Sequence, residues 1–290
     1  MNLRVYHRTR YVYRTAVTDS HNEVRLRPAT EDPRRLHFFL LKVHPPKRLR
    51  HRRDDFFNYV QWFDIPEPHT ELIIEATSHV VTTSPYTEGR PLGCNFWQYK
   101  EDEASDMLHP FLSGSEYVSI ENDVWRLAID AREDRQDVFE SAEAIMNFIH
   151  SGWSYTPHAT HAQTHMNEVL ADRRGVCQDF AHVMLGMCRT QGIPARYVSG
   201  YLYNGPMGHL RGAMASHAWC EVWLPGRGWY GLDPTNNTLA DERYVKIATG
   251  RDYADAAPIR GSFSGPHGAT SVLEVKVEVE EMKASAIKRP

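Results

Sequence analysis

The chain has 290 residues, of which 41% are hydrophobic and 24% are charged, and its formal net charge at pH 7 is −4. This composition supplies an apolar core for one large domain or two modest domains. It lacks the strong charge imbalance that marks proteins bound to nucleic acids or to membranes, so we expect neither partner, while the oligomeric state stays open.

The first residues of the chain read as a strand and not as an export signal. Residues 1–8 contain no apolar segment of signal-peptide type, and no apolar run is long enough to cross a bilayer. Cysteines in a protein without an export signal are expected to be reduced, so the sequence predicts a cytoplasmic protein. The cysteines are Cys94, Cys177, Cys188 and Cys220.

Residues 1–115 contain several segments in which apolar and polar residues alternate, as half-buried strands do. They predict a small N-terminal β-sandwich-like domain, with an irregular linker over residues 85–115. The strands are expected at residues 3–13, 22–28, 36–43, 59–65 and 71–82. The basic run 47–53 lies between two strands and is followed by two aspartates, so it favours a solvated hairpin over a nucleic-acid patch.

The pattern becomes helical from about residue 118. Apolar residues recur at helical spacing in 120–131 and in 138–151, and Gly152 ends the second helix. The aromatic residues Trp153 and Tyr155 follow; they either pack in the core or line a pocket.

His161 and His165 are four residues apart, and Glu168 is three residues further on. On a helix this spacing places two imidazoles and a carboxylate on one face, which is compatible with a metal site. The segment lacks a His-Glu-x-x-His motif, and the chain contains 16 histidines, so chance spacings are common. We therefore predict no metal site here.

Residues 175–182 read Gly-Val-Cys-Gln-Asp-Phe-Ala-His, and a helix is predicted from Asp179 to Gln191 with Cys177 at its first turn. A helix N-terminus presents unpaired backbone N–H groups and the positive end of the helix dipole. Both favour a thiolate, which is the nucleophilic form of cysteine. At this point Cys177 is either a nucleophile or a small buried hydrophobe. His182 lies off the face of Cys177 on this helix and is expected to be a packed core histidine.

The strand after this helix begins near Pro194 and contains Gly200, which either allows close approach of a substrate or marks a bulge. Residues 204–215 are rich in glycine and methionine and predict a mobile loop just before His217.

Residues 216–224 predict a strand with one apolar face, because apolar and polar residues alternate. The apolar face holds Ala218, Cys220, Val222 and Leu224, and the other face holds His217, Trp219, Glu221 and Trp223. A turn at 225–228 leads to a second strand, 229–232, which ends at Asp233 because Pro234 keeps that residue extended. The hairpin is therefore expected to bring His217 and Asp233 close together.

Three more segments follow in the chain. Residues 244–249 predict a strand, residues 251–268 read as irregular, and residues 272–280 alternate strictly and are expected to close a sheet.

Cys177, His217 and Asp233 are the three residue types that thiol acyl chemistry needs. An imidazole takes the proton of the thiol and returns it to the leaving amine, and a carboxylate orients the imidazole. A helix that carries the cysteine, packed on a sheet that carries the other two, is a recurring arrangement.

Four motifs in this order resemble the bacterial transglutaminase-like superfamily, which contains predicted cysteine proteases. They are residues 175–182, Gly-Ile-Pro-Ala-Arg-Tyr-Val-Ser-Gly-Tyr at 192–201, His-Ala-Trp at 217–219 and Asp-Pro-Thr-Asn at 233–236. The resemblance implies a papain-like core in which Cys177 is the nucleophile, His217 the general base and Asp233 the orienting acid.

The resemblance also extends outward from the core. Glu-Val-Arg-Leu-Arg-Pro at 23–28 resembles the β-rich N-terminal domain that accompanies this core, and Gly-Arg-Asp-Tyr at 250–253 resembles its C-terminal segment. The N-terminal domain usually carries Asp-x-Phe-Gly-Asn where this chain reads Asp-Phe-Phe-Asn-Tyr at 55–59. The local turn of this chain therefore departs from the family pattern.

We therefore predict an α+β protein with three parts: a β-rich domain with its linker at 1–115, a transglutaminase-like core at 116–283 and a frayed tail at 284–290. The favoured function is a cysteine-dependent amide hydrolase that acts on a protein or peptide through a Cys177 thioester. Two alternatives are a protein-glutamine acyltransferase with the same three residues and a non-catalytic binding module. No cofactor is expected, because thiol acyl chemistry needs none.

Overall fold

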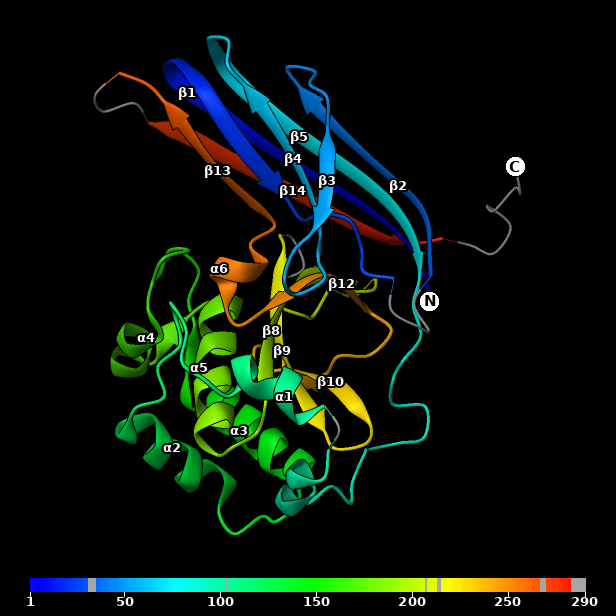
Figure 1. Ribbon diagram of the computed structural model, residues 1–290, viewed down its shortest axis with the longest axis vertical. Helices are drawn as coiled ribbons and strands as arrows, with labels where there is room; N and C mark the ends of the chain where they lie inside the picture. Colours follow the sequence, from blue (N-terminus) through cyan, green and yellow to red (C-terminus); the bar gives the residue numbers. More distant parts are fainter. Residues whose placement is uncertain (31–34, 103, 207, 213–214, 267–269, 283–290) are drawn as a thin grey trace.

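The structure of the chain is a computed structural model. It describes residues 1–30, 35–102, 104–206, 208–212, 215–266 and 270–282, so the predicted tail 284–290 lies outside the described residues. A large twisted sheet lies above a mixed core of helices and strands (Figure 1). Within the described part of the chain, none of the helices has the length and apolar character needed to cross a bilayer.

The long strand β1 (Asn2–Val24) organises the upper sheet. The sheet has seven strands in the order β2-β5-β1-β4-β3, and β13 and β14 also pair with β1. The other strands are β2 (Arg35–His44), β3 (Arg50–Arg53), β4 (Tyr59–Ile65), β5 (His69–Val81), β13 (Ile259–Ser264) and β14 (Ser271–Glu281). The predicted strand-rich N-terminal region is therefore confirmed.

The two halves of β1 have different neighbours. Its first half runs between β5 and β14, and its second half, from Thr18 to Val24, runs between β4 and β13. The sequence pattern predicted two separate strands and the two stacked layers of a sandwich. The structure instead has one strand and one sheet, because β1 continues through a register shift between Val12 and Val17. Such an irregularity breaks the alternation without ending the strand.

The strands β13 and β14 follow the core in the chain but pair with β1. The sequence prediction placed 259–281 with the core, because alternation identifies a strand and not its partner. The prediction that 251–268 is irregular is wrong for the described residues of that range, which contain α6 (Tyr253–Ala256) and β13.

The segment 85–115 also has more structure than predicted. It contains three short helices, η1 (Phe96–Lys100), α1 (Ser105–Leu108) and η2 (His109–Phe111). The Tyr86 hydroxyl donates to the Gly231 carbonyl at 2.6 Å, and the Tyr99 hydroxyl donates to the Trp223 carbonyl at 2.7 Å. These bonds hold the segment against the core.

The core is built around α5 (Cys177–Thr190), whose residues 179–189 are all buried. The two predicted helices before it are confirmed as α2 (Asn122–Arg132) and α3 (Val138–Gly152). They pack against α5 together with α4 (Met166–Asp172). The two-residue strands β6 (Ser154–Tyr155) and β7 (Arg174–Gly175) pair in parallel just before α5.

A five-stranded sheet in the order β11-β10-β9-β8-β12 lies against α5. Its strands are β8 (Ala195–Leu202), β9 (His217–Leu224), β10 (Gly228–Asp233), β11 (Thr238–Leu239) and β12 (Tyr244–Gly250). The predicted apolar face of β9 is confirmed, since Ala218, Cys220, Val222 and Leu224 lie in the main hydrophobic core. Trp219, on the opposite face, packs with Val198 and Tyr244 in a second cluster.

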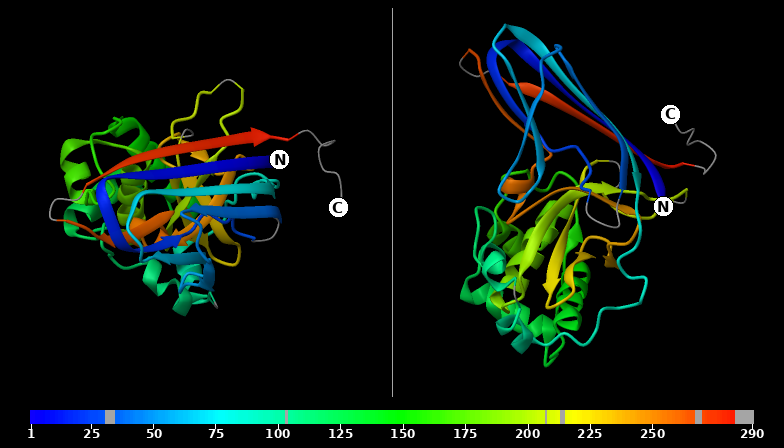
Figure 2. Two further views of the ribbon diagram at one scale, coloured as in Figure 1. Left: turned by 90° about the horizontal axis from the view of Figure 1, so that it is seen from above. Right: turned by 45° about the vertical axis from the view of Figure 1, so that its right-hand side comes forward.

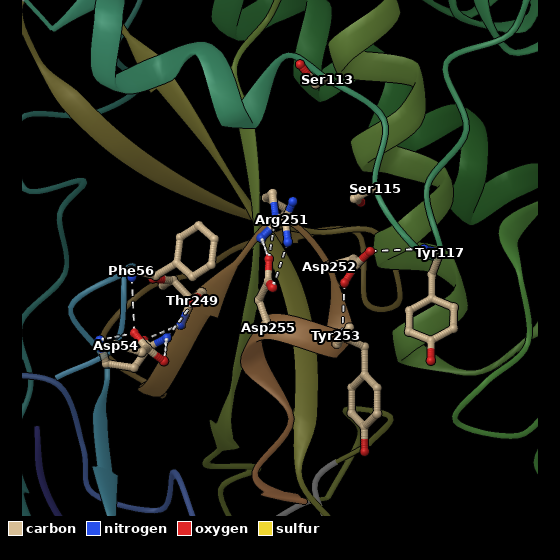
Figure 3. Close-up of polar contacts among 12 residues, drawn as sticks. Asp54, Phe56, Ser113, Ser115, Tyr117, Thr249, Arg251, Asp252, Tyr253 and Asp255 are labelled. Carbon is tan, nitrogen blue, oxygen red and sulfur yellow. Dashed lines mark hydrogen bonds and ion pairs between the residues drawn. The ribbon is translucent and has the colours of Figure 1, made fainter. Parts of the chain in front are cut away.

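The turn that departs from the family pattern joins the two sheets. Asp54 closes this turn by accepting the backbone N–H groups of Phe56 and Asn58. The Asn58 side chain then bonds both backbone groups of Thr249 in β12, at 2.7 and 2.8 Å. Figure 3 shows this junction beside the Arg251–Asp255 ion pair at the start of α6. The upper sheet is thereby anchored to the core.

Candidate active site

Cys177 is the first residue of α5, so its backbone N–H belongs to the groups that have no partner inside the helix. The helix is buried behind it, and the positive end of its dipole faces the thiol. The prediction of a cysteine at a helix N-terminus is confirmed. The side chain is partly exposed, whereas the other three cysteines are buried.

Asp179 holds the turn that presents Cys177. Its Oδ2 accepts the Val176 backbone N–H at 2.7 Å and the Thr160 hydroxyl at 2.5 Å. A Cβ at position 175 would lie 2.6 Å from the same oxygen, so only glycine fits there. Burial raises the pKa of Asp179, although its two donors act in the opposite direction. The geometry of the first turn of α5 therefore depends on a buried carboxyl group.

His217 and Asp233 come together at the end of the predicted hairpin. His217 begins β9, Asp233 ends β10, and the two strands pair in antiparallel fashion. Nε2 of His217 lies 2.8 Å from Oδ2 of Asp233, and both side chains are fully buried. The expectation that these two residues lie close together agrees with this geometry.

Asp233 accepts four further hydrogen bonds. Its Oδ2 receives the Tyr244 hydroxyl and the Asn236 side-chain amide, both at 2.8 Å. Its Oδ1 receives the backbone N–H groups of Thr235 at 2.9 Å and of Asn236 at 3.3 Å. A carboxylate that accepts several donors is stabilised in its charged form.

The pKa values of the pair move in opposite directions. Burial alone would lower the pKa of His217, but the charge of Asp233, the hydrogen bond to Asp233 and the interaction with Cys177 raise it to about 10. Burial alone would raise the pKa of Asp233, but His217, Asn236 and Tyr244 hold it below its ordinary value. The favoured state is therefore an imidazolium beside a carboxylate.

A cavity of about 340 Å³ contains both Cys177 and His217. Aromatic side chains line it, namely Tyr155, Tyr197 and Tyr253. Nε2 of His217 faces Asp233, while the buried Nδ1 makes no hydrogen bond of standard geometry within the described residues. His217 also interacts with Cys177, and the two line the same cavity, so the structure brings all three predicted residues together.

The loop before β9 approaches the same imidazole. Gly212 has a positive φ of 83°, and a Cβ there would lie 2.4 Å from Nδ1 of His217. The Asn236 amide bonds both backbone groups of Arg211, at 2.8 and 3.2 Å, while it also bonds Asp233. Asn236 therefore links the position of this loop to that of the carboxylate. Residues 207, 213 and 214 of the predicted mobile loop lie outside the described residues.

Two contacts of Asp233 were not anticipated from the sequence. Asn236 lies in the motif at 233–236, and its spacing of three residues from Asp233 could have predicted a local hydrogen bond between the two side chains. Tyr244 comes from β12, which lies at the far side of the sheet order, so no local pattern pointed to it. Its hydroxyl also lies 2.8 Å from that of Thr238.

Of the other residues that the sequence singled out, Gly200 and Trp153 serve the packing of the core, and Tyr155 lines the cavity. Gly200 makes room for Trp219, since a Cβ at position 200 would lie 2.4 Å from the Trp219 ring. The pairing of β12 with β8 also shifts register just after Lys246, the residue opposite Gly200. Trp153 is buried and donates its ring N–H to the Val169 carbonyl at 3.3 Å. Tyr155 lines the cavity, and burial and the nearby Cys177 raise its pKa to about 12.

The remaining histidines have local partners. His182 is fully buried, its Nε2 accepts the Tyr253 backbone N–H at 3.2 Å, and burial lowers its pKa to about 3. The prediction of a packed core histidine is confirmed. His165 caps α4 by accepting the Asn167 N–H. Among the residues described, no three or more His, Cys, Asp or Glu side chains gather in a way that could hold a metal ion.

Tyr244→Phe is expected to lower kcat/KM by about 10- to 100-fold, because a hydrogen bond to a charged group contributes about 1.5–3 kcal/mol. The Tyr244 donor lowers the pKa of Asp233, so its removal should also start the acid loss of stability at a higher pH. Thermal melting between pH 3 and 6 measures this shift.

Tyr99→Phe is the matched control, since its hydroxyl donates to the Trp223 carbonyl at 2.7 Å, outside the candidate site. Equal effects of the two variants on rate and on acid stability would show that Tyr244 acts only in packing.

Two family models match the chain. The bacterial transglutaminase-like N-terminal region matches residues 3–81, and the transglutaminase-like superfamily matches residues 126–234. An uncharacterised protein of Mycobacterium tuberculosis is 34% identical over 298 residues, which cover 98% of this chain and 94% of that protein. The chain therefore belongs to the transglutaminase-like superfamily, as its motifs predicted.

Two further comparisons concern an enzyme and a fold. A protein-glutamine gamma-glutamyltransferase of Pseudomonas aeruginosa is 34% identical over 129 residues, which cover 41% of this chain and 19% of that enzyme. A crystal structure from Cytophaga hutchinsonii, assigned provisionally as a cysteine protease, has a TM-score of 0.75 and 24% identity, covering 98% of this chain and 92% of that one. The latter confirms the predicted α+β fold with its transglutaminase-like, papain-like core.

Proposed function

We propose that the protein is a cysteine-dependent acyl-transfer enzyme in which Cys177 is the nucleophile, His217 the general acid and base, and Asp233 the orienting carboxylate. The observation that carries the proposal is the arrangement around His217. Asp233 holds one ring nitrogen at 2.8 Å, and Cys177 interacts with the ring inside the same cavity. A nucleophile, a base and a group that orients the base form the minimal set for covalent acyl transfer.

The reaction begins when the Cys177 sulfur, having given its proton to His217, attacks an amide carbonyl carbon. The C–S bond forms, the C–N bond breaks, and the proton on His217 passes to the leaving nitrogen. A thioester on Cys177 and a free amine result. Water or a second amine then attacks the thioester, His217 takes its proton, and the C–S bond breaks to restore the thiol.

The negative oxygen that develops during each attack needs hydrogen-bond donors. The backbone N–H of Cys177 is suited to this role, because it is unpaired at the N-terminus of α5. The dipole of the helix acts in the same direction.

The favoured acceptor is water, which makes the protein an amide hydrolase acting on a protein or peptide. The second candidate is transfer to an amine, and it is supported by the similarity of 129 residues to the gamma-glutamyltransferase. A non-catalytic binding module would tolerate replacement of any of the three residues, and all three are present.

Alkylation by iodoacetamide tests the proposal without a known substrate. We expect Cys177 to react at pH 7 at least ~100-fold faster than Cys94, Cys188 and Cys220, because the last three are buried and burial raises the pKa of each. His217→Ala should remove the advantage of Cys177. Peptide mass spectrometry measures the rate at each cysteine.

Slow alkylation of Cys177 at every pH would contradict the proposal and favour the binding module. After fast alkylation, a screen of amide donors with and without hydroxylamine separates the acceptors. At a low concentration of hydroxylamine a hydrolase still releases mainly the free acid, whereas a transferase forms mainly the hydroxamate.

We infer a cytoplasmic location from the cysteines. All four are free, including the partly exposed Cys177, and a reducing compartment keeps such a thiol active. Fractionation of the native host with an antibody against the protein tests this inference.

A further inference from the structure

A second cavity adjoins the one that contains Cys177. Its volume is about 90 Å³, and it shares Ser216, Tyr253 and Pro258 with the larger cavity. Its other wall belongs to the upper sheet and is made by residues of β1 and β14, including Tyr11, Leu273 and Val275. A single small cavity therefore lies between the cavity of the candidate nucleophile and β14.

The side chains of β14 that form this wall are apolar and exposed to solvent. In the register of the two strands Leu273 lies opposite Tyr11 and Val275 lies opposite Thr9, so these side chains share the face that lines the cavity. Leu273 is 54% exposed and Val275 is 41% exposed, whereas Val277, two residues further along the same face, is only 8% exposed. Apolar side chains are thus uncovered where the strand passes the cavity.

The backbone of β14 is open as well. It pairs with β1 over 11 positions, from Ser271 to Glu281, and within the described ranges no strand pairs with its other edge. Figure 2 shows β14 as the outermost strand beside β1 when the molecule is seen from above. An open edge is a template for an added strand, and alternate side chains of that strand then meet the pockets beside it.

Tyr253 lines both cavities, and its backbone and that of its neighbour are held by hydrogen bonds. Its backbone N–H donates to Nε2 of His182 at 3.2 Å. Asp252 caps the short helix α6 through the Ala254 N–H at 2.8 Å and accepts the Tyr117 N–H at 3.0 Å (Figure 3). These bonds fix the backbone at the place where the two cavities meet, between β14 and Cys177.

We propose that the polypeptide that carries the reactive amide binds in an extended form along β14, with its apolar side chains on Leu273 and Val275. This inference rests on the proposed function, and it names the substrate class as unfolded or extended protein segments with apolar residues two positions apart. An extended segment of the substrate fits this groove better than a second copy does, because the groove adjoins the cavity that contains Cys177 and shares three lining residues with it.

The test compares a long and a short substrate. The double variant Leu273→Ser/Val275→Ser replaces the two apolar side chains of the groove by polar ones. Val272→Ser is the matched control, because Val272 is 53% exposed on the opposite face of the same strand. The long substrate is β-casein, scored by new amino termini, ammonia and hydroxamate. The short one is p-nitrophenyl acetate, which acylates the thiol without reaching β14.

We expect the double variant to lose about 10-fold in kcat/KM on β-casein and less than 2-fold on p-nitrophenyl acetate, since two apolar contacts are removed. Val272→Ser should change neither. An equal loss on both substrates, an equal effect of Val272→Ser, or wild-type activity on p-nitrophenyl acetate alone would overturn the inference. So would a wild-type dimer in sedimentation that the double variant abolishes. Wild-type inactivity on both substrates would instead refute the proposed function itself.

Discussion

Replacing Cys177 by serine is expected to lower kcat/KM on an amide substrate by about 10⁴-fold or more. The serine hydroxyl occupies the same place at the start of α5, but it is a far weaker nucleophile than a thiolate. A serine hydroxyl is also a much weaker acid than a thiol, so it gives its proton to His217 far less readily. The variant should therefore bind substrate and fail to form an acyl-enzyme.

Cys94→Ser is the control for this experiment. Cys94 is 2% exposed and lies near the Pro225 carbonyl, away from the cavity, so its replacement should leave the rate within about 2-fold. Steady-state rates and intact-protein mass spectrometry of the acyl-enzyme provide the measurements. Retention of a tenth or more of the activity by Cys177→Ser would show that the thiol is not the nucleophile.

Asp233→Asn is expected to lower kcat by about 10⁴-fold, because the imidazole loses the charge that orients it. The pH profile should change as well. With Asp233 present the pKa of His217 is about 10, and the charge of Asp233 is the largest of the causes that raise it, so its loss lowers the pKa of the imidazole. The alkaline limb of the activity, which reports loss of the imidazolium proton, should therefore move to lower pH.

The same pair sets a window of stability. The pKa of His217 in the folded protein lies above its unfolded value of 6.5, so the stabilisation is fully present below pH 6.5 and is lost as the pH rises towards 10. The pKa of Asp233 lies below its unfolded value of 3.8, so its stabilisation is present above pH 3.8 and is lost as the pH falls further. The melting temperature of the wild type should therefore be highest and nearly constant between pH 3.8 and pH 6.5, where both stabilisations are present.

Asp241→Asn is the matched control, since Asp241 is a partly exposed carboxylate that pairs with Arg243 close to the site. It should leave the rate and both limbs unchanged. If Asp233→Asn left the alkaline limb near pH 10, another group would have to set the charge of His217.

The parts of the candidate site that a local pattern encodes were predictable. The helix that carries Cys177 has apolar spacing and a glycine before its first turn, and β9 alternates strictly up to the turn that leads to β10. Because the two strands are joined by a short turn, their pairing places His217 near Asp233. Local periodicity therefore sufficed for the positions of the three residues.

Contacts between distant segments were not predictable in this way. Tyr244 reaches Asp233 only because β12 joins the sheet beside β8, and β-strand patterns do not specify such neighbours. The same reason explains why β14 was recognised as a strand but its partner β1 was not. The groove beside β14 depends on that pairing and was therefore missed.

The pairing of β14 with β1 has a consequence for the order of folding on the ribosome. Leu3 lies opposite Glu281, so β1 keeps one edge uncovered during synthesis until the strand that follows the core has emerged. The wall at Tyr253 and Pro258 is also made late, and the cavity around Cys177 is closed on that side only then. A nascent chain in which Cys177 has already been synthesised thus carries an open β-edge and an unfinished cavity, and both are completed by strands that are translated after the core.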